Sequence, residues 1–159
     1  MIMDAGSIMT RTVITAGPDD TVRALAALFT RHGISAVPIC DKDGMLLGVI
    51  SEGDLMRPFG QANKLRRDWW LGLLAEGTDL APEFLDYLRI DNHRARDLMT
   101  ASAITATEST TVSEIADLLQ RHHIKRVPIV RDGKVVGIVS RADLVRALAR
   151  TPDALVDPD

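Results

Sequence analysis

The sequence is poor in the residues that mark several large classes of protein. It has one cysteine, Cys40, so a disulfide framework is excluded. No apolar run approaches the roughly 18 residues of a membrane span, and the N-terminus, with an acid at Asp4, is not typical of a secretory signal. The net charge is −3, and no basic run marks a nucleic-acid-binding face. We therefore expect a cytoplasmic protein that binds neither membrane nor nucleic acid.

Patterns typical of catalysis are also missing. The sequence contains no phosphate-binding loop, no dinucleotide-binding glycine pattern and no Ser-His-Asp arrangement in a recognisable setting. Cys40 lies in an apolar segment, and His122 and His123 have no partner at metal-ligand spacing. His32 and His122 instead lie in predicted last helical turns, where a cation interacts favourably with the helix dipole. We expect neither an enzyme nor a structural metal site.

What the sequence does contain is a duplication. Residues 9–39 match residues 99–129 position by position, and the match resumes where GVISEGDL at 48–55 aligns with GIVSRADL at 137–144. A self-match of this length indicates a repeated structural unit. Each copy has about 50 residues, near the lower limit for independent stability, so we expect the two to pack as a pseudo-two-fold pair. The cleft between them is the first place to expect a ligand.

Each copy has the pattern of an α/β unit in the order strand, helix, strand, strand, helix. The apolar spacing i, i+3, i+4, i+7 predicts the first helix in both copies, and in the second copy it follows a Thr111–Glu114 capping box. Gly33 is expected to end this helix in the first copy, and His123 stands at that place in the second. Ser51 and Ser140 open the last helix. The predicted strands are residues 12–15, 36–40 and 45–50, then 102–105, 127–130 and 135–139.

A segment between the copies belongs to neither. Its helical spacing predicts helices at 63–75 and 82–88. The only two tryptophans, Trp69 and Trp70, would lie about 100° apart on the first of these, so both are buried only against partners on two sides. The ordinary interpretation is that one Trp packs on the domain and the other shields an interface. The alternative hypothesis is that the insert helps to form a homodimer or docks a partner. The predicted boundaries are 7–56 for the first copy, 57–96 for the helical insert, 97–148 for the second copy and 149–159 for a flexible tail.

Three motifs, in the same order in both copies, resemble the CBS domain, the family named after cystathionine β-synthase. They are an opening Met-Thr followed by Ile-Thr, an apolar Val-Pro-Ile, and a closing Gly-x-x-Ser-x-x-Asp, at residues 9–15, 37–39 and 48–54 and again at 99–105, 127–129 and 137–143. Members of this family occur as pairs called Bateman modules. The tryptophan-containing insert is similar to one found in bacterial stand-alone pairs, some of which carry a C-terminal BON domain. No BON-like segment follows Arg150.

The resemblance implies ligand-binding residues in each copy. In similar domains the Asp of the closing motif holds the ribose hydroxyls of an adenosine nucleotide, and the Ser lies near the ribose or phosphate. The same Ser-x-x-Asp pattern is close to an ordinary helix cap, so both roles stay open. The Val-Pro strand would line the adenine or be ordinary core. The preceding Thr would line the cleft or be an ordinary residue of an exposed strand. These residues are Thr15, Ala36, Val37, Pro38, Ser51 and Asp54 in the first copy and Thr105, Val127, Pro128, Ser140 and Asp143 in the second.

The copies differ in charge just before the Val-Pro step. The second copy has Lys125 and Arg126 where the first has Ser35 and Ala36, and Arg141 adds a third cation. In similar nucleotide-binding domains, basic side chains here meet phosphates, and an Arg fork or a Lys point charge suits that contact. Two solvated cations on a strand flank are the alternative. We expect an anionic nucleotide to favour the second copy.

These observations favour a regulatory module that senses adenosine-containing nucleotides. The expected ligand is AMP, ADP, ATP or another adenosyl compound such as S-adenosylmethionine, NAD or a cyclic dinucleotide. No cofactor is required, and Mg²⁺ would enter only with a bound triphosphate. The module would bias an unknown effector protein or domain through its change of state. The alternative is an assembly module with degenerate clefts that acts through protein contacts alone.

Overall fold

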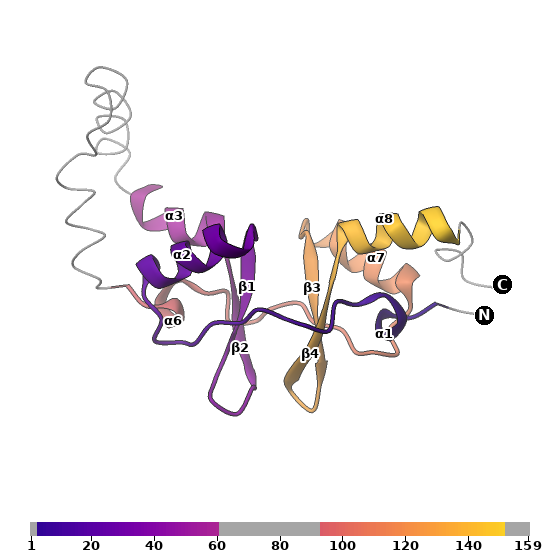
Figure 1. Ribbon diagram of the computed structural model, residues 1–159, viewed down its shortest axis with the longest axis horizontal. Helices are drawn as coiled ribbons and strands as arrows, with labels where there is room; N and C mark the ends of the chain where they lie inside the picture. Colours follow the sequence, from indigo (N-terminus) through magenta and orange to yellow (C-terminus); the bar gives the residue numbers. More distant parts are fainter. Residues whose placement is uncertain (1–2, 61–92, 152–159) are drawn as a thin grey trace, which may run out of the picture. The chain divides into compact units, whose positions relative to one another are not determined.

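The computed structural model describes residues 3–60 and 93–151. The helices predicted at 63–75 and 82–88, with Trp69 and Trp70, lie outside the described residues. Figure 1 labels the elements, which are α1 (Ala5–Ile8), α2 (Val22–His32), β1 (Ala36–Cys40), β2 (Leu46–Ser51), α3 (Glu52–Gly60), α6 (Ala95–Leu98), α7 (Val112–Arg121), β3 (Arg126–Arg131), β4 (Lys134–Ser140) and α8 (Arg141–Arg150).

The chain forms two compact units, and neither coincides with one sequence repeat. Unit 1 comprises Met1–Thr15, Cys40–Leu46 and Ser102–Asp159, and unit 2 comprises Ala16–Ile39 and Leu47–Ala101. Each unit therefore combines most of one repeat with the opening segment of the other, and unit 1 also contains the β1–β2 turn of the first repeat. The short helix α1 belongs to the unit of the second repeat, and α6 belongs to the unit of the first.

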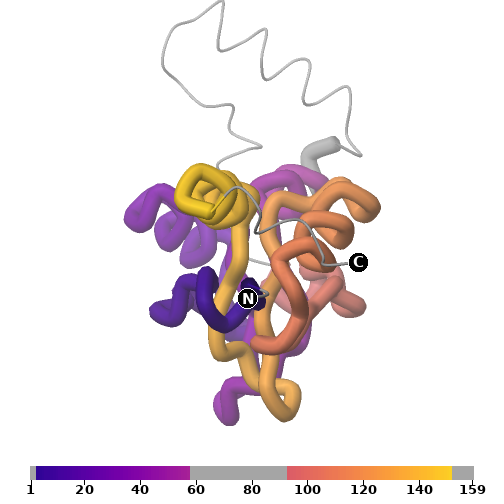
Figure 2. Tube along the Cα trace, turned by 90° about the vertical axis from the view of Figure 1, so that its right-hand side faces the viewer, coloured from indigo at the N-terminus to yellow at the C-terminus, as the bar shows by residue number. Residues whose placement is uncertain are grey.

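The hairpin β3–β4 is the sheet of unit 1. Its strands are antiparallel, with Val127 opposite Val139 and an irregularity between Ile129 and Val130. Its turn is tight because Asp132 and Gly133 have positive φ values of 52° and 79°. Two consecutive left-handed residues match the right-handed twist of the flanking strands, which explains the Asp-Gly sequence. Figures 1 and 2 show α7 and α8 at the end of this hairpin away from its turn.

Local sequence accounts for both long helices of unit 1. Thr111 caps α7 with a reciprocal box to Glu114, and the buried face of this helix carries Val112, Ile115 and Leu119. Helix α8 buries Leu144 and Ala147 and packs on both α7 and β4. These apolar side chains meet in one core. Its buried members are Ala5, Met9, Ala106, Val112, Ile115, Leu119, Val127, Ile129, Val139 and Leu144.

The opening segment of the first repeat completes this core. The amide of Thr10 donates to the carbonyl oxygen of Ile138 at 2.8 Å, and the Ile138 amide donates back at 3.0 Å. Met9 is buried directly over Gly137, where the sulfur and Cβ of the methionine occupy the space that a side chain on the glycine would need. A hydrogen-bonded bridge and a glycine contact therefore attach α1 to β4.

Unit 2 repeats this arrangement with the opening segment of the second repeat. The Thr100 amide donates to the Val49 carbonyl oxygen at 3.0 Å, and the return bond is 3.2 Å. Met99 lies over Gly48, as Met9 lies over Gly137. Strands β1 and β2 form the sheet of this unit. Helix α2 buries Val22, Leu25 and Phe29.

The structure departs from the sequence expectation at the start of each repeat. The segments 12–15 and 102–105 are not strands, and a single bridge forms one residue later in each repeat. Ala16 and Ala106 make these parallel bridges, to Ile39 and Ile129. The four-residue helices α1 and α6 have no counterpart in the sequence prediction. Gly33 is the left-handed C-cap of α2, as predicted, with a φ of 62°. Helix α7 ends earlier than expected, with His122 as its C-cap, and the left-handed residue His123 follows with a φ of 53°.

Candidate functional site

In unit 1 the closing motif forms the start of helix α8. Ser140 is the N-cap, and its hydroxyl accepts a hydrogen bond from the Asp143 amide at 3.2 Å. The Asp143 Oδ2 accepts from the Ser140 amide at 2.7 Å and from the Ser140 hydroxyl at 3.0 Å. The Asp143 side chain is only 6 % exposed, and its Oδ1 forms an ion pair with Arg146. The capping role of this motif is therefore present in the structure.

The basic residues predicted for the site gather at the same helix start. Arg126 lies opposite Ser140 in the register of β3 and β4. The Arg141 amide donates to the Lys125 carbonyl oxygen at 2.9 Å, which ties the residue before β3 to the first residue of α8. Lys125 and Arg141 are exposed and Arg126 is half-buried. The structure thus places Lys125, Arg126 and Arg141 next to the Ser140–Asp143 helix start in the backbone arrangement.

The other predicted residues of this copy lie along the strand. Val127 and Pro128 are buried, Val127 completely, so their side chains belong to the core of unit 1. The Pro128 carbonyl oxygen accepts from the Ala106 amide at 3.1 Å. Thr105 is exposed and directly precedes Ala106 in the chain. It therefore lies beside β3, the strand that begins at Arg126.

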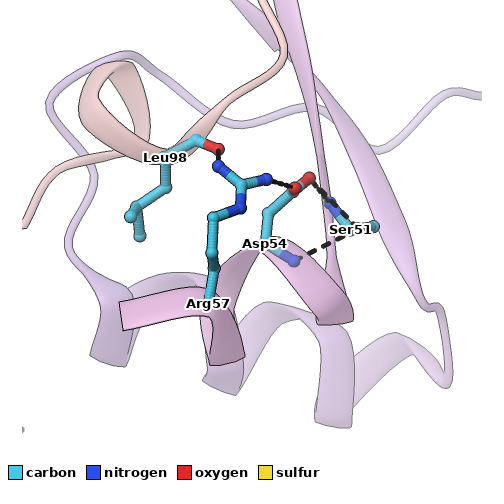
Figure 3. A network of polar contacts seen from close by, with 4 residues as sticks. All are labelled: Ser51, Asp54, Arg57 and Leu98. Atoms are coloured by element: carbon cyan, nitrogen blue, oxygen red, sulfur yellow. Dashed lines mark hydrogen bonds and ion pairs between the residues drawn. The ribbon is translucent and has the colours of Figure 1, made fainter. Parts of the chain in front are cut away.

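Unit 2 has the same carboxylate arrangement (Figure 3). The Asp54 Oδ2 accepts from the Ser51 amide at 2.8 Å and from the Ser51 hydroxyl at 3.1 Å. Its Oδ1 forms an ion pair with Arg57, whose guanidinium also donates to the Leu98 carbonyl oxygen at 3.4 Å. Arg57 thus links the carboxylate of α3 to the C-terminal end of α6.

The remaining predicted residues of the first copy resemble their counterparts. Ala36, Val37 and Pro38 are buried in β1, and Thr15 is exposed one residue before the bridge at Ala16. No positive charge corresponds to Lys125 and Arg126, because the sequence has Ser35 and Ala36 there.

Arg57 and Arg146 are site residues that the sequence prediction missed. Both stand three residues after the aspartate, in DLMR and DLVR, and this spacing brings two helical side chains together. A carboxylate has about four acceptor positions, and Ser, its amide and Arg occupy three of them in each unit. Two hydrogen bonds from a ribose diol therefore require one of these partners to move.

Metal-binding side chains and the one cysteine are two other possible functional groups among the described residues. Residues 3–60 and 93–151 hold no cluster of three His, Cys, Asp or Glu side chains able to bind a metal ion. Burial raises the pKa of the Cys40 thiol, and the Asp41 charge raises it further. The thiol therefore stays neutral, which lowers its reactivity as a nucleophile. No helix among the described residues is both long and apolar enough to cross a bilayer.

The doubled unit and its Ser-x-x-Asp helix starts define a pair of CBS domains. The CBS domain family matches residues 5–59 and 95–150, and the chain belongs to this family. This confirms the resemblance and the α/β tandem-repeat fold that the sequence predicted. CBS pairs are regulatory rather than catalytic modules.

Three relatives cover nearly the whole chain. Uncharacterized protein MJ1426 of Methanocaldococcus jannaschii is 33 % identical over 159 residues, 92 % of each chain. The structure of Arabidopsis thaliana CBSX2 in complex with AMP is 25 % identical, with a TM-score of 0.71 over 94 % of this chain and 98 % of that one. The CBS pair of protein MJ0100, in complex with 5′-methylthioadenosine and S-adenosyl-L-methionine, is also 25 % identical, with a TM-score of 0.68 over 94 % and 98 %. Related CBS pairs thus bind adenosine compounds.

Proposed function

We propose that this chain is a regulatory module that senses adenosine-containing nucleotides. The carboxylate of Asp143 would hold the ribose hydroxyls at the start of α8, and the cations beside it would meet the phosphate. The observation that carries the proposal is the gathering of Arg126, Arg141 and Lys125 around the Ser140–Asp143 motif. The AMP complex of a relative 25 % identical to this chain supports the choice of ligand.

The proposed output is a change in the state of a partner. Binding of the diol displaces Arg146 or Arg57 from its carboxylate, because the acceptor positions are nearly full. In unit 2 this displacement also releases the Leu98 carbonyl, so the ligand would loosen α6. A ligand that binds one state better shifts the population toward that state, and an effector protein or domain would respond to the shift. No resident cofactor is proposed, and Mg²⁺ would accompany only a triphosphate.

A panel of thermal melts tests this proposal. AMP, ADP, ATP, S-adenosylmethionine, NAD and a cyclic dinucleotide are added to the wild type, to Asp143→Asn and to Asp117→Asn as an exposed-carboxylate control on α7. A ligand at 100 times its Kd stabilises the native state by about 2.7 kcal/mol and must raise the Tm. We expect a Tm increase in the wild type and the control, and a smaller one in Asp143→Asn. If none of these compounds raises the Tm of the wild type, the sensor proposal is wrong.

An assembly module is the second candidate, and one observation favours it. Val145 and Leu148 are 65 % and 42 % exposed on α8, and Met56 is 50 % exposed at the position of α3 that matches Val145. Large apolar side chains exposed on one helix face in both repeats suit a contact with a second copy of the chain. We propose a homodimer on this basis, and dimerisation is compatible with ligand sensing.

A further inference from the structure

The two candidate sites carry opposite charges at equivalent positions. Glu52 follows Ser51 as the first residue of α3, and Arg141 follows Ser140 as the first residue of α8. Both charged side chains are exposed. The carboxylate motif beside each of them is the same, so a reversal of charge distinguishes two otherwise similar helix starts.

The backbone holds the two positions in the same way. The Glu52 amide donates to the Ser35 carbonyl oxygen at 2.9 Å, and the Arg141 amide donates to the Lys125 carbonyl oxygen at 2.9 Å. Each helix start therefore lies beside the residue that precedes the Val-Pro strand, a serine in unit 2 and a lysine in unit 1. Arg126 adds a third positive charge in unit 1, where unit 2 has an alanine. The two helix starts thus share this backbone hydrogen bond and differ in side-chain charge.

The side chains of Glu52, Lys125 and Arg141 are exposed to an approaching ligand. Within residues 3–60 and 93–151, no ion pair involves Glu52, Lys125 or Arg141. A helix N-terminus attracts anions in both units. The basic side chains add to this attraction in unit 1, and the carboxylate of Glu52 opposes it in unit 2. Because the charges are exposed, salt should weaken both effects.

We infer that the two sites separate adenosine compounds by the charge of the 5′ group. The site of unit 1 takes adenosine 5′-phosphates, and the site of unit 2 takes adenosine compounds that are neutral or positively charged at that position. Glu52 is the residue that determines the specificity of unit 2. This inference rests on the proposed function, because it assigns a ligand class to each site that the function assumes.

Three probes with one scaffold and different charges test it. They are AMP, adenosine and 5′-amino-5′-deoxyadenosine, titrated by calorimetry at low salt and at high salt. The unit 2 site is isolated in Asp143→Asn and the unit 1 site in Asp54→Asn. Glu52→Arg and Arg141→Glu then reverse the charge in the respective backgrounds. Arg150→Glu, at the far exposed end of α8, makes the same change of net charge as Arg141→Glu and is the control.

The expected result is an opposite order of affinity at the two sites. Unit 1 binds AMP most tightly and the amino compound least, and unit 2 shows the reverse. Exposed charge pairs each change affinity by up to about fivefold, so a charge reversal should shift the ratio of AMP to amino-compound affinity by roughly tenfold or more at low salt. Glu52→Arg should give unit 2 the order of unit 1, and Arg150→Glu should leave both orders as they are.

Adenosine separates the two ways in which the inference could fail. It carries no 5′ charge, so its binding reports the proposed function alone. If none of the three probes binds either background, the proposed function and this inference are both wrong. If the probes bind but Glu52→Arg leaves their order in unit 2 unchanged, the charge assignment alone is overturned.

The wild-type background gives a second readout that needs no aspartate variant. Glu52→Arg, in a chain with both carboxylates intact, should raise the number of AMP molecules bound per chain from one to two at an AMP concentration that fills only the unit 1 site of the wild type. This measurement decides the inference even where Asp143→Asn or Asp54→Asn fails to fold. An unchanged number of bound AMP molecules contradicts the role of Glu52.

Discussion

At the scale of single residues, the carboxylates of Asp54 and Asp143 each have most of their acceptor positions occupied by a serine and an arginine. Asp143 is 6 % exposed, and its ion-pair partner Arg146 is 60 % exposed. A buried carboxylate that loses its cation keeps the cost of its desolvation, whereas two exposed partners lose little on separation. The contribution of each ion pair to the free energy of unfolding therefore depends on how deeply its acid is buried, not on how many ion pairs the chain has.

Removal of Arg146 should destabilise the protein more than removal of an exposed partner does. We expect Arg146→Ala to lower the free energy of unfolding by about 1–2 kcal/mol, because it leaves a buried carboxylate with only its capping bonds. Arg121→Ala is the matched control, since Arg121 pairs with Asp117 at 64 % and 56 % exposure and should cost less than about 1 kcal/mol. Urea denaturation of both variants measures the difference. Equal costs would show that Asp143 does not depend on its arginine.

The left-handed residue after helix α7 offers a second test at this scale. His123 has a φ of 53°, in a region that costs a side-chain-bearing residue roughly 1 kcal/mol, and the first repeat has Gly33 there with a φ of 62°. His123→Gly should therefore stabilise the protein by about 0.5 kcal/mol, after the entropy of glycine in the unfolded chain is subtracted. Gly33→Ala should destabilise it by about 1 kcal/mol. Thermal melts of the two variants should move in opposite directions.

At the scale of elements, each opening segment is attached by a methionine over a glycine. Gly48 in β2 and Gly137 in β4 lie directly under Met99 and Met9. Any Cβ on these glycines would enter space that the opposite segment fills, so the closing strand and the opening segment depend on each other. This dependence explains a glycine inside a strand, where the residue is otherwise unfavourable.

Substitution of Gly48 should loosen α6 from unit 2. A Cβ there would lie 2.7 Å from the backbone oxygen of Thr100, and the backbone cannot yield as a flexible side chain can. We expect Gly48→Ala to cost about 2 kcal/mol, within the usual range of overpacking. Gly53→Ala is the control, because its nearest atom is 3.6 Å away and alanine suits a helix, so stability should rise by about 0.5 kcal/mol. Hydrogen exchange should also show faster opening of residues 95–98 in Gly48→Ala.

The sequence predicts the elements whose signals are local. Capping boxes and apolar spacing predict α7 and α8, and the Asp132–Gly133 turn follows from its dipeptide. The four-residue helices α1 and α6 were not predicted, because so short a segment shows no helical spacing of apolar residues. Ser140 and Asp143 were found as a motif, but Arg146 was missed because only its closeness to a buried acid distinguishes it from other surface arginines. The attachment of α1 to β4 depends on contacts between residues far apart in sequence, which periodicity does not report.

At the scale of the whole molecule, the exposed apolar residues of α3 and α8 are the main surface feature to explain. Met56 and Val145 occupy the same position in the two repeats, and both are at least half exposed. A duplicated exposed apolar position is the observation on which the proposed contact of these helices rests. The proposed partner is a second copy of the chain.

A charged residue on this face should dissociate the proposed homodimer. The chain has a mass of 17.4 kDa, so light scattering after size exclusion distinguishes monomer from dimer. We expect a dimer for the wild type and a monomer for Val145→Glu with Leu148→Glu, because two buried like charges oppose the contact. Arg150→Glu controls for the change in net charge. A wild-type monomer at micromolar concentration contradicts the homodimer proposal.

The exchange of opening segments bears on whether either repeat can fold alone. One repeat by itself lacks part of its core, because the bridge to its closing strand comes from the opening segment of the other copy. A chain cut between the repeats should therefore regain its fold only when both halves are present together.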